Sequence, residues 1–289
     1  MSGPRLAGPR AMPGLALVEA GPSAVVACCS TLYGSPLAQL LVGESFHPGG
    51  LESTRQLLAA AGLLAGARLL DAGCGLGASA RVAAAEFGLE VDAVDASAGV
   101  VSRAAASDAG GVRWATADLL ALPFDDATFD AVLAECVLST LPRGAGLAEL
   151  RRVTRRGGRL VVSDVEADGA AVDALAGHPV LGAALCLTDA WRDGELEERL
   201  GAAGFVLEHR WDRSASIIDL VDRVEARVRL AVAVAKGSSP DLAGLAAAAG
   251  LGDIGAGGVD GVRRLADQVR DAVRGGGLRY FAAVARAAA

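Results

Sequence analysis

Short apolar runs alternate with longer stretches of helical periodicity through the middle of the chain. This pattern predicts strands at residues 68–71, 90–94, 112–116, 129–133 and 159–163, and helices at 78–87, 97–106 and 146–153. Strands that alternate with helices at this spacing indicate an α/β fold, in which helices cover both faces of a mainly parallel sheet.

The pattern continues toward the C-terminus with a predicted helix at 189–203 and predicted strands at 205–211 and 278–285. Between these strands, residues 216–235 and 259–273 have helical patterns, and we interpret the Gly- and Ala-rich stretch 237–258 as including a linker. We therefore expect a Rossmann-like core of seven strands, residues 67–215 and 277–289. A helical insertion at 216–276 could cap a substrate pocket.

The N-terminal part divides into two segments. Residues 1–22 are rich in Gly, Pro and Ala without a period, which predicts a flexible arm. Residues 23–66 are expected to form a helical segment. Its clearest elements are a turn at 45–50 and an amphipathic helix at 51–63.

Composition and charge restrict the classes of function. The 289 residues are 52% hydrophobic and carry a net charge of −7, so a globular core is expected and nucleic acid is a poor candidate partner. No apolar run reaches the length that spans a membrane, and the first 20 residues lack the apolar core of a secretory signal. We expect a cytoplasmic protein, not associated with membranes, whose five cysteines are reduced thiols.

The first predicted strand ends at Asp71 and opens into three glycines at alternate positions, Gly73, Gly75 and Gly77. A strand, a glycine turn and a helix in succession typically place a nucleotide-like ligand at the carboxyl end of the strand. Dinucleotide-binding turns follow the pattern G-x-G-x-x-G, whereas this turn follows G-x-G-x-G after an acid. The spacing therefore argues against a nicotinamide or flavin cofactor.

This D-x-G-x-G-x-G pattern resembles motif I of the class I S-adenosylmethionine (SAM) dependent methyltransferases. Asp95 follows at the tip of the second predicted strand, where a carboxylate can accept hydrogen bonds from both ribose hydroxyls. Asp118-Leu119 lies in a segment that resembles the family's D-x-x-x-L-P-F, in which the acid and the next amide meet adenine. Gly157-Gly158 resembles the family's turn before strand five, although Arg156 replaces the usual proline.

The resemblance implies that SAM is the cofactor. It implies cofactor contacts from Asp71, Gly73, Gly75, Gly77, Asp95, Ala96, Asp118, Leu119 and Glu135. It also implies that strands six and seven pair in an antiparallel hairpin, and that the segment 23–66 lies over the cofactor mouth.

Methyl transfer from SAM is a displacement that needs a general base only when the acceptor atom carries a proton to be removed. His47, in the turn beside the expected pocket, is the candidate base, and Glu135 is a second one. Both residues would serve an organic acceptor.

The cysteines suggest a different acceptor. Cys136 follows strand four in a segment that resembles the N-C-V-x-N-L of arsenite methyltransferases, with Glu135 and Thr140 in place of the two asparagines. Cys186 resembles that family's second cysteine, and Cys28-Cys29 resembles its N-terminal pair. The resemblance implies that these thiolates hold As(III), a thiophilic substrate, and that a thiol reductant takes part. Cys74, in the glycine turn, is interpreted as packing.

Three functions follow from the sequence. The first is methylation of trivalent arsenic, and the second is methylation of a small organic metabolite at O, N or C, in a pocket lined by residues 216–276. The third is a SAM-binding module without catalysis, in which the helical stretch 217–235 docks a partner. Mutation of Cys136 separates the first function from the second.

Overall fold

The computed structural model describes residues 42–43, 45, 47–176, 187–235 and 252–288. The expected arm at 1–22, Cys28, Cys29 and Cys186 lie outside these residues. So does the first part of the expected linker, up to residue 251. The division of the chain into the four segments expected above stays a prediction.

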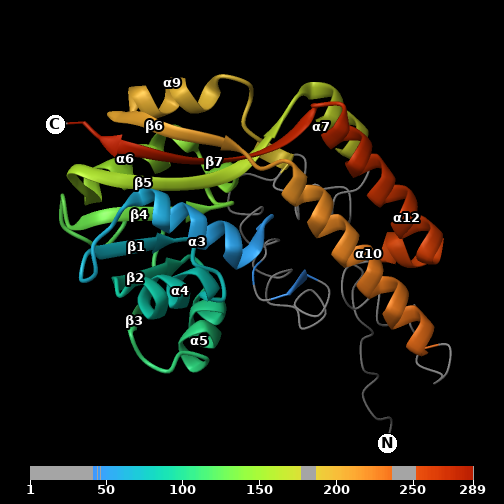
Figure 1. Ribbon diagram of the computed structural model, residues 1–289, viewed down its shortest axis with the longest axis horizontal. Helices are drawn as coiled ribbons and strands as arrows, with labels where there is room; N and C mark the ends of the chain where they lie inside the picture. The colour runs from blue at the N-terminus through green and yellow to red at the C-terminus, as the bar shows by residue number, and fades with distance from the viewer. Residues whose placement is uncertain (1–41, 44, 46, 177–186, 236–251, 289) are drawn as a thin grey trace, which may run out of the picture.

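Seven strands form one sheet in the order β3-β2-β1-β4-β5-β7-β6 (Figure 1). The strands are β1 (Arg68–Ala72), β2 (Glu90–Asp95), β3 (Val112–Thr116), β4 (Phe129–Glu135), β5 (Thr154–Ala167), β6 (Phe205–Asp212) and β7 (Leu278–Ala287). Strands β1 to β5 pair in parallel, and β7 lies antiparallel between β5 and β6. The predicted α/β fold and the antiparallel pairing of the last two strands are confirmed.

Helices cover both faces of this sheet. They are α3 (Gly50–Ala61), α4 (Ala78–Phe87), α5 (Ala98–Ala106), α6 (Arg143–Val153), α7 (Gly169–Ala176), α9 (Glu195–Ala202), α10 (Ala215–Ala235) and α12 (Gly252–Arg274), with 3₁₀ turns η1 (Leu138–Thr140) and η2 (Leu187–Asp189). Helices α3 and α4 pack on one face around Leu69 and Leu133, and α6 and α9 pack on the other around Leu70 and Val132. Strands β1 and β4 are buried on both faces, which explains why their sequences are continuous apolar runs.

Three helix boundaries differ from the sequence prediction. Helix α6 begins at Arg143, directly after Pro142, and not at 146. Helix α9 begins at Glu195 and not at 189, because Gly194 adopts a left-handed φ of 76° that separates it from η2. Helix α12 begins at Gly252, inside the stretch expected to be a linker. Glycine lowers intrinsic helix propensity, and the packing of α12 against α10 outweighs that preference.

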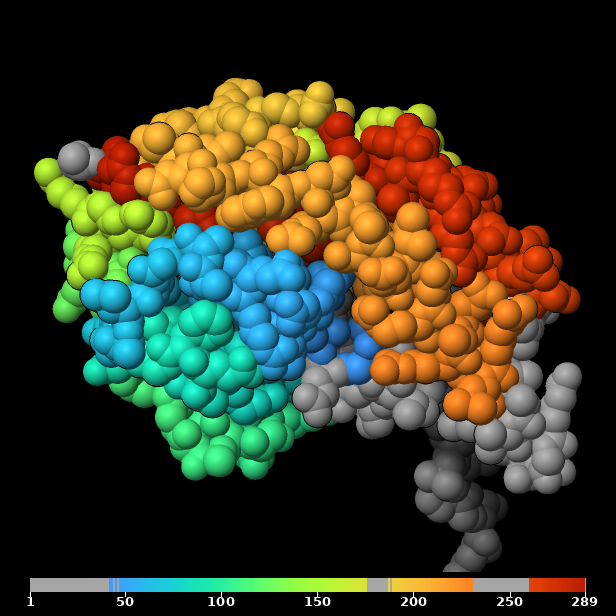
Figure 2. Space-filling model, in the orientation of Figure 1, coloured from blue at the N-terminus to red at the C-terminus, as the bar shows by residue number. Residues whose placement is uncertain are grey.

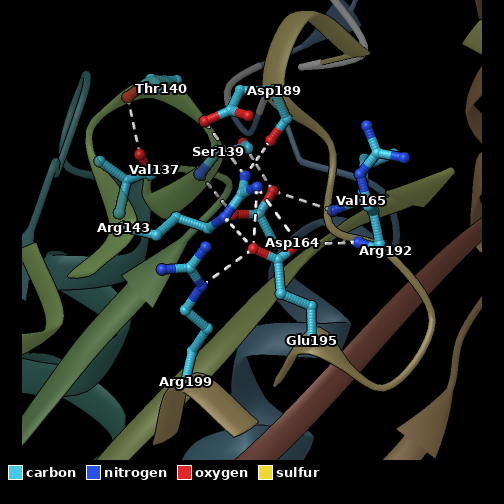
Figure 3. Close-up of polar contacts among 10 residues, drawn as sticks. All are labelled: Val137, Ser139, Thr140, Arg143, Asp164, Val165, Asp189, Arg192, Glu195 and Arg199. Carbon is cyan, nitrogen blue, oxygen red and sulfur yellow. Dashed lines mark hydrogen bonds and ion pairs between the residues drawn. The ribbon is translucent and has the colours of Figure 1, made fainter. Parts of the chain in front are cut away.

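A buried polar network joins β5 and η1 to the segment before α9 (Figure 3). Asp164 of β5 is fully buried and accepts hydrogen bonds from the Ser139 amide at 2.9 Å and from its hydroxyl at 2.7 Å. Arg143 stacks over Trp191 at 5.0 Å and lies 3.1 Å from Glu195. These contacts fix the chain that leaves the carboxyl end of β4.

Helices α10 and α12 form the inserted unit, which extends away from the sheet beyond β6 and β7 (Figure 1). Arg270 of α12 lies 2.6 Å from both Asp222 and Glu225 of α10, and this ion-pair network joins the two helices. None of the described helices has the length and apolar composition needed to cross a membrane.

Replacement of a central strand residue tests this core. Leu133→Ala should lower the free energy of unfolding by about 2–5 kcal/mol, because Leu133 is fully buried between β1 and β5. Leu230→Ala is the matched control, since Leu230 is 65% exposed on α10 and should change stability by no more than about 0.5 kcal/mol. Urea denaturation followed by circular dichroism measures both values, and equal effects would contradict this account of the core.

Candidate cofactor and acceptor site

The glycine turn lies at the carboxyl end of β1. Gly73, Gly75 and Gly77 all adopt positive φ values, of 77°, 52° and 77°. A Cβ atom on Gly73 would lie 2.5 Å from a methyl group of Val137, and one on Gly77 would collide with the ring of Trp114. Glycine is therefore required here by both the backbone conformation and the close packing around the turn.

Asp95, at the end of β2, holds this turn in place. Its two carboxylate oxygens accept hydrogen bonds from the amides of Gly75, at 3.1 Å, and Ser97, at 2.9 Å. Partial burial raises the pKa of Asp95. Each carboxylate oxygen has a further lone pair, so the group can still accept hydrogen bonds from a diol. Ala96, which follows it, is exposed at the same edge.

Asp118 and Leu119 follow β3 at the neighbouring position, where the Ala117 amide donates to the carbonyl of Asp95. Asp118 is exposed, and its Oδ1 accepts from the Leu120 amide at 2.9 Å. The Leu119 side chain is buried in the core, so only its backbone can meet a ligand. The exposed carboxylate of Asp118 fits the expected contact with adenine.

Polar side chains from four strands line the face of the sheet that α3 and α4 cover. They are Asp71 on β1, Glu135 on β4, Ser163 on β5 and Tyr280 on β7. Ser163 pairs with Glu135 in the parallel register, and the Tyr280 hydroxyl donates to the Ser163 hydroxyl at 2.8 Å. We call these four residues the polar row.

Glu135 is the most heavily hydrogen-bonded member of the polar row. The Ser79 hydroxyl of α4 donates to it at 2.6 Å, and the Thr54 hydroxyl of α3 lies 3.1 Å away. His47 Nε2 lies 3.4 Å from Glu135 Oε2, and His47 Nδ1 lies 3.2 Å from the Pro48 carbonyl. His47 Nε2 also lies 3.3 Å from the Thr54 hydroxyl. His47 thus contacts both Glu135 and a residue that is bonded to Glu135, and its role as a base stays a prediction.

Asp71 is buried beside Glu135. It is 3% exposed, and its Oδ2 has no hydrogen-bond partner. Burial, followed by the charges of Glu135 and Asp95, raises the pKa of Asp71 to about 8. Asp71 is therefore protonated and uncharged at neutral pH. A cation bound in this corner of the site would favour its ionised form.

Cys136 lies at the other side of Glu135, directly after β4. It adopts a φ of 54°, uncommon for a residue other than glycine, and its amide donates to the Ser163 carbonyl at 2.8 Å. Its thiol is 3.6 Å from the Tyr280 hydroxyl. Cys74 packs in the core, as expected, and burial raises the pKa of its thiol.

The structure brings most of the predicted site together. The glycine turn, Asp95, Asp118, Leu119, Glu135 and Cys136 all lie at the carboxyl edge of the sheet, whereas Cys28, Cys29 and Cys186 lie outside the described residues. Sequence reasoning missed Thr54, Ser79, Ser163 and Tyr280. Ser163 carried a signal, because it is a polar residue in an apolar strand. The other three lie at positions that only the packing of helices and strands relates.

Comparison with known proteins finds one family match, over part of the chain. Residues 70–162 match the model of a methyltransferase domain. Over 73 residues the chain is 44% identical to the demethylmenaquinone methyltransferase of Mycolicibacterium vanbaalenii. The aligned segment covers 25% of this chain and 31% of that protein. Over 61 residues it is 41% identical to the O-methyltransferase cnsE of Penicillium expansum, 22% of whose length is covered. The chain thus matches only a third or less of either curated relative.

Solved structures with the same fold cover most of the chain. A sarcosine dimethylglycine methyltransferase of Galdieria sulphuraria has a TM-score of 0.68 at 18% identity, covering 86% of this chain and 96% of that one. A phosphoethanolamine N-methyltransferase of Haemonchus contortus, in complex with SAM, has a TM-score of 0.68 at 16% identity, covering 96% and 60%. The [4+2]-cyclase SpnF has a TM-score of 0.58 at 23% identity, covering 82% and 80%.

The domain match covers residues 70–162, and the fold is the one that these methyltransferase structures have. Both curated relatives are methyltransferases, and these matches leave the acceptor of this chain open. The likeness to the solved structures shows the fold alone.

Asp71 makes the stability of the folded protein depend on pH. Its pKa is about 8 in the folded protein, against an ordinary value of 3.8, so the stability that it contributes is complete below about pH 4 and is lost as the pH rises toward 8. The wild type should lose up to about 1.4 kcal/mol per pH unit relative to Asp71→Asn over this window. Urea titrations of both proteins at several pH values measure the difference. A difference that stays constant with pH would contradict the protonated state of Asp71.

Proposed function

We propose that this chain is a SAM-dependent methyltransferase that acts on a small organic acceptor. One observation carries this proposal: the glycine turn, Asp95 and Asp118 lie at the same edge of the sheet as two buried acids, Asp71 and Glu135. The first three suit an adenine and a ribose. The acids suit the cationic end of SAM, which carries an ammonium and a sulfonium.

The cofactor would extend along the edge of the sheet from β3 to β4. Asp118 and the Leu119 amide would meet the adenine, and Asp95 would accept hydrogen bonds from the ribose hydroxyls. The glycine turn would let the backbone approach the cofactor closely, and Glu135 and Asp71 would face its positive charge. When bound, SAM supplies the methyl group on a leaving sulfur.

The acceptor would approach from the side of Cys136, Ser163 and Tyr280. The two candidate general bases at this edge, Glu135 and His47, are engaged with each other and with Ser79 and Thr54. An acceptor atom with an available lone pair, such as a neutral amine, fits this arrangement best. The nitrogen takes the methyl group, and the resulting ammonium gives its proton to solvent.

Methylation of As(III) is the second candidate. In its favour, Cys136 lies at the acceptor side in a constrained backbone conformation. The other expected thiolates, Cys28, Cys29 and Cys186, lie outside the described residues. None of the relatives and structures named above is an arsenite methyltransferase. The arsenite hypothesis therefore rests on the sequence resemblance and on Cys136.

A SAM-binding module without methyl transfer is the third candidate. Its support is the cyclase among proteins of this fold, which shows that the fold alone does not determine the reaction. Transfer of label from methyl-labelled SAM to any acceptor would exclude this candidate.

Replacement of Asp95 tests the cofactor site. Asp95→Ala should weaken binding of S-adenosylhomocysteine about tenfold or more, because it removes hydrogen bonds to the ribose and the anchor of the Gly75 amide. Asp125→Ala is the matched control, since Asp125 is exposed in a turn. Calorimetric titration gives both affinities. Equal, tight binding of S-adenosylhomocysteine by the wild type and by Asp95→Ala would contradict the placement of the ribose.

Replacement of Cys136 separates the acceptors. Cys136→Ser should leave methylation of an organic acceptor within a few fold of the wild type, whereas it should abolish methylation of arsenite by removing a thiolate ligand. The measurement compares both proteins with SAM, arsenite and a thiol reductant, and then with a panel of small amines. Methylated arsenic from the wild type alone would overturn the organic acceptor.

A further inference from the structure

Several buried polar atoms have no hydrogen-bond partner within the described part of the chain. Three of the six are Ser45 Oγ, Ser53 Oγ and Arg213 Nε. Ser53 is 7% exposed. Unpaired buried polar atoms are uncommon in folded proteins, and an absent ligand is one explanation for them.

Ser53 and Arg213 belong to two segments that meet. A Cβ atom on Gly49, at the start of α3, would lie 3.3 Å from Ser53 Oγ and 3.3 Å from Ser216 Oγ in the first turn of α10. The Ser216 amide in turn donates to the Arg213 carbonyl at 2.8 Å. In Figure 2, the surfaces of α3 (blue) and α10 (orange) adjoin at this junction. We call this region the α3–α10 junction.

Arg213 faces the acceptor side of the site. Its amide donates to the Tyr280 carbonyl at 2.7 Å, which continues the antiparallel register of β6 and β7 by one residue. Residues directly opposite in such a pair have side chains on the same face, so Arg213 shares its face with Tyr280. This face also carries Ser163 and Glu135.

The charge of Arg213 is not balanced by any carboxylate in the described part of the chain. Its neighbour Asp212 accepts from the amide and hydroxyl of Ser214. Arg81 and Arg151 also have no carboxylate partner, but their guanidinium groups donate to backbone carbonyls. The arginines for which no side-chain contact of any kind is recorded there are exposed: Arg156, Arg192, Arg223 and Arg264. Arg213 differs from them because its Nε is buried.

The unpaired groups at the junction can both donate hydrogen bonds, since they are the Ser53 hydroxyl and the Nε–H of the Arg213 guanidinium. Helix α3 and helix α10 both begin here, and the N-cap of α3 is Gly49, which supplies no capping side chain. Donors, a cation and helix N-termini together suit an anion with several oxygen atoms.

We propose that the α3–α10 junction, with Arg213 as its cation, binds an anionic carboxylate or phosphate group of the methyl acceptor. This inference rests on the proposed function and narrows its acceptor to a small molecule that carries an anion beside the nucleophilic atom. Arg213 is then a residue that determines substrate specificity.

Binding of inorganic phosphate to the full-length protein saturated with S-adenosylhomocysteine tests this inference. Saturation occupies the cofactor site, so phosphate reports on the acceptor side. The wild type should bind phosphate saturably in a calorimetric titration. Arg213→Gln should weaken this binding about tenfold or more, because it removes a charged donor. The matched control Arg223→Gln changes an exposed arginine on α10 and should leave phosphate binding unchanged.

A conservative variant and a check of the fold distinguish the possible outcomes of this experiment. Arg213→Lys keeps the charge and should retain part of the phosphate affinity, and circular dichroism verifies the fold of each variant. Absence of phosphate binding to the wild type, or equal effects of the Arg213 and Arg223 variants, would overturn the inference. So would a loss of S-adenosylhomocysteine affinity in Arg213→Gln that matches its loss of phosphate affinity, because the anion recognised would then be the cofactor's own. A wild type that binds no S-adenosylhomocysteine would instead overturn the proposed function.

Discussion

Two carboxyl groups, Asp71 and Glu135, are buried next to each other at the carboxyl edge of the sheet. Burial raises the pKa of Asp71, and the like charge of Glu135 raises it further. Ser79, Thr54 and His47 satisfy Glu135, while one oxygen of Asp71 has no partner. The site is thus organised around negative charge that the protein only partly compensates, and a cationic ligand would complete it.

The sheet topology makes this arrangement possible. The carboxyl ends of parallel strands meet at one edge, so acids from β1, β2 and β4 come together although they are far apart in sequence. The packing leaves little freedom there, since a side chain at Gly73 would displace Val137 of the loop after β4. The network around Asp164 and Arg143 then holds that loop from the other face.

The sequence predicted the sheet and the cofactor half of the site because both depend on local patterns. Apolar runs locate buried strands, and the spacing of Gly73, Gly75 and Gly77 reports the backbone of one turn. The start of α12 could not be predicted, because the glycines in its first turns lower the helix propensity that a sequence pattern reports.

The acceptor half of the site depends on contacts between distant segments. No spacing relates Thr54 to Glu135, or Ser216 to Gly49, because helix α3 must pack on β4 and against α10 before these residues meet. His47 was interpreted as a base from its position in a turn. The structure shows both of its nitrogens beside oxygen atoms, which only the folded geometry could reveal.

The central claim is that the positive charge of SAM meets the buried acids, and proton counting tests it most directly. Calorimetric titration of SAM at pH 7, in two buffers with different ionisation enthalpies, gives the number of protons exchanged on binding. The account predicts a net release of up to about one proton, because a nearby cation lowers the pKa of Asp71 from about 8. Binding without proton release, proton uptake, or no binding of SAM would contradict it.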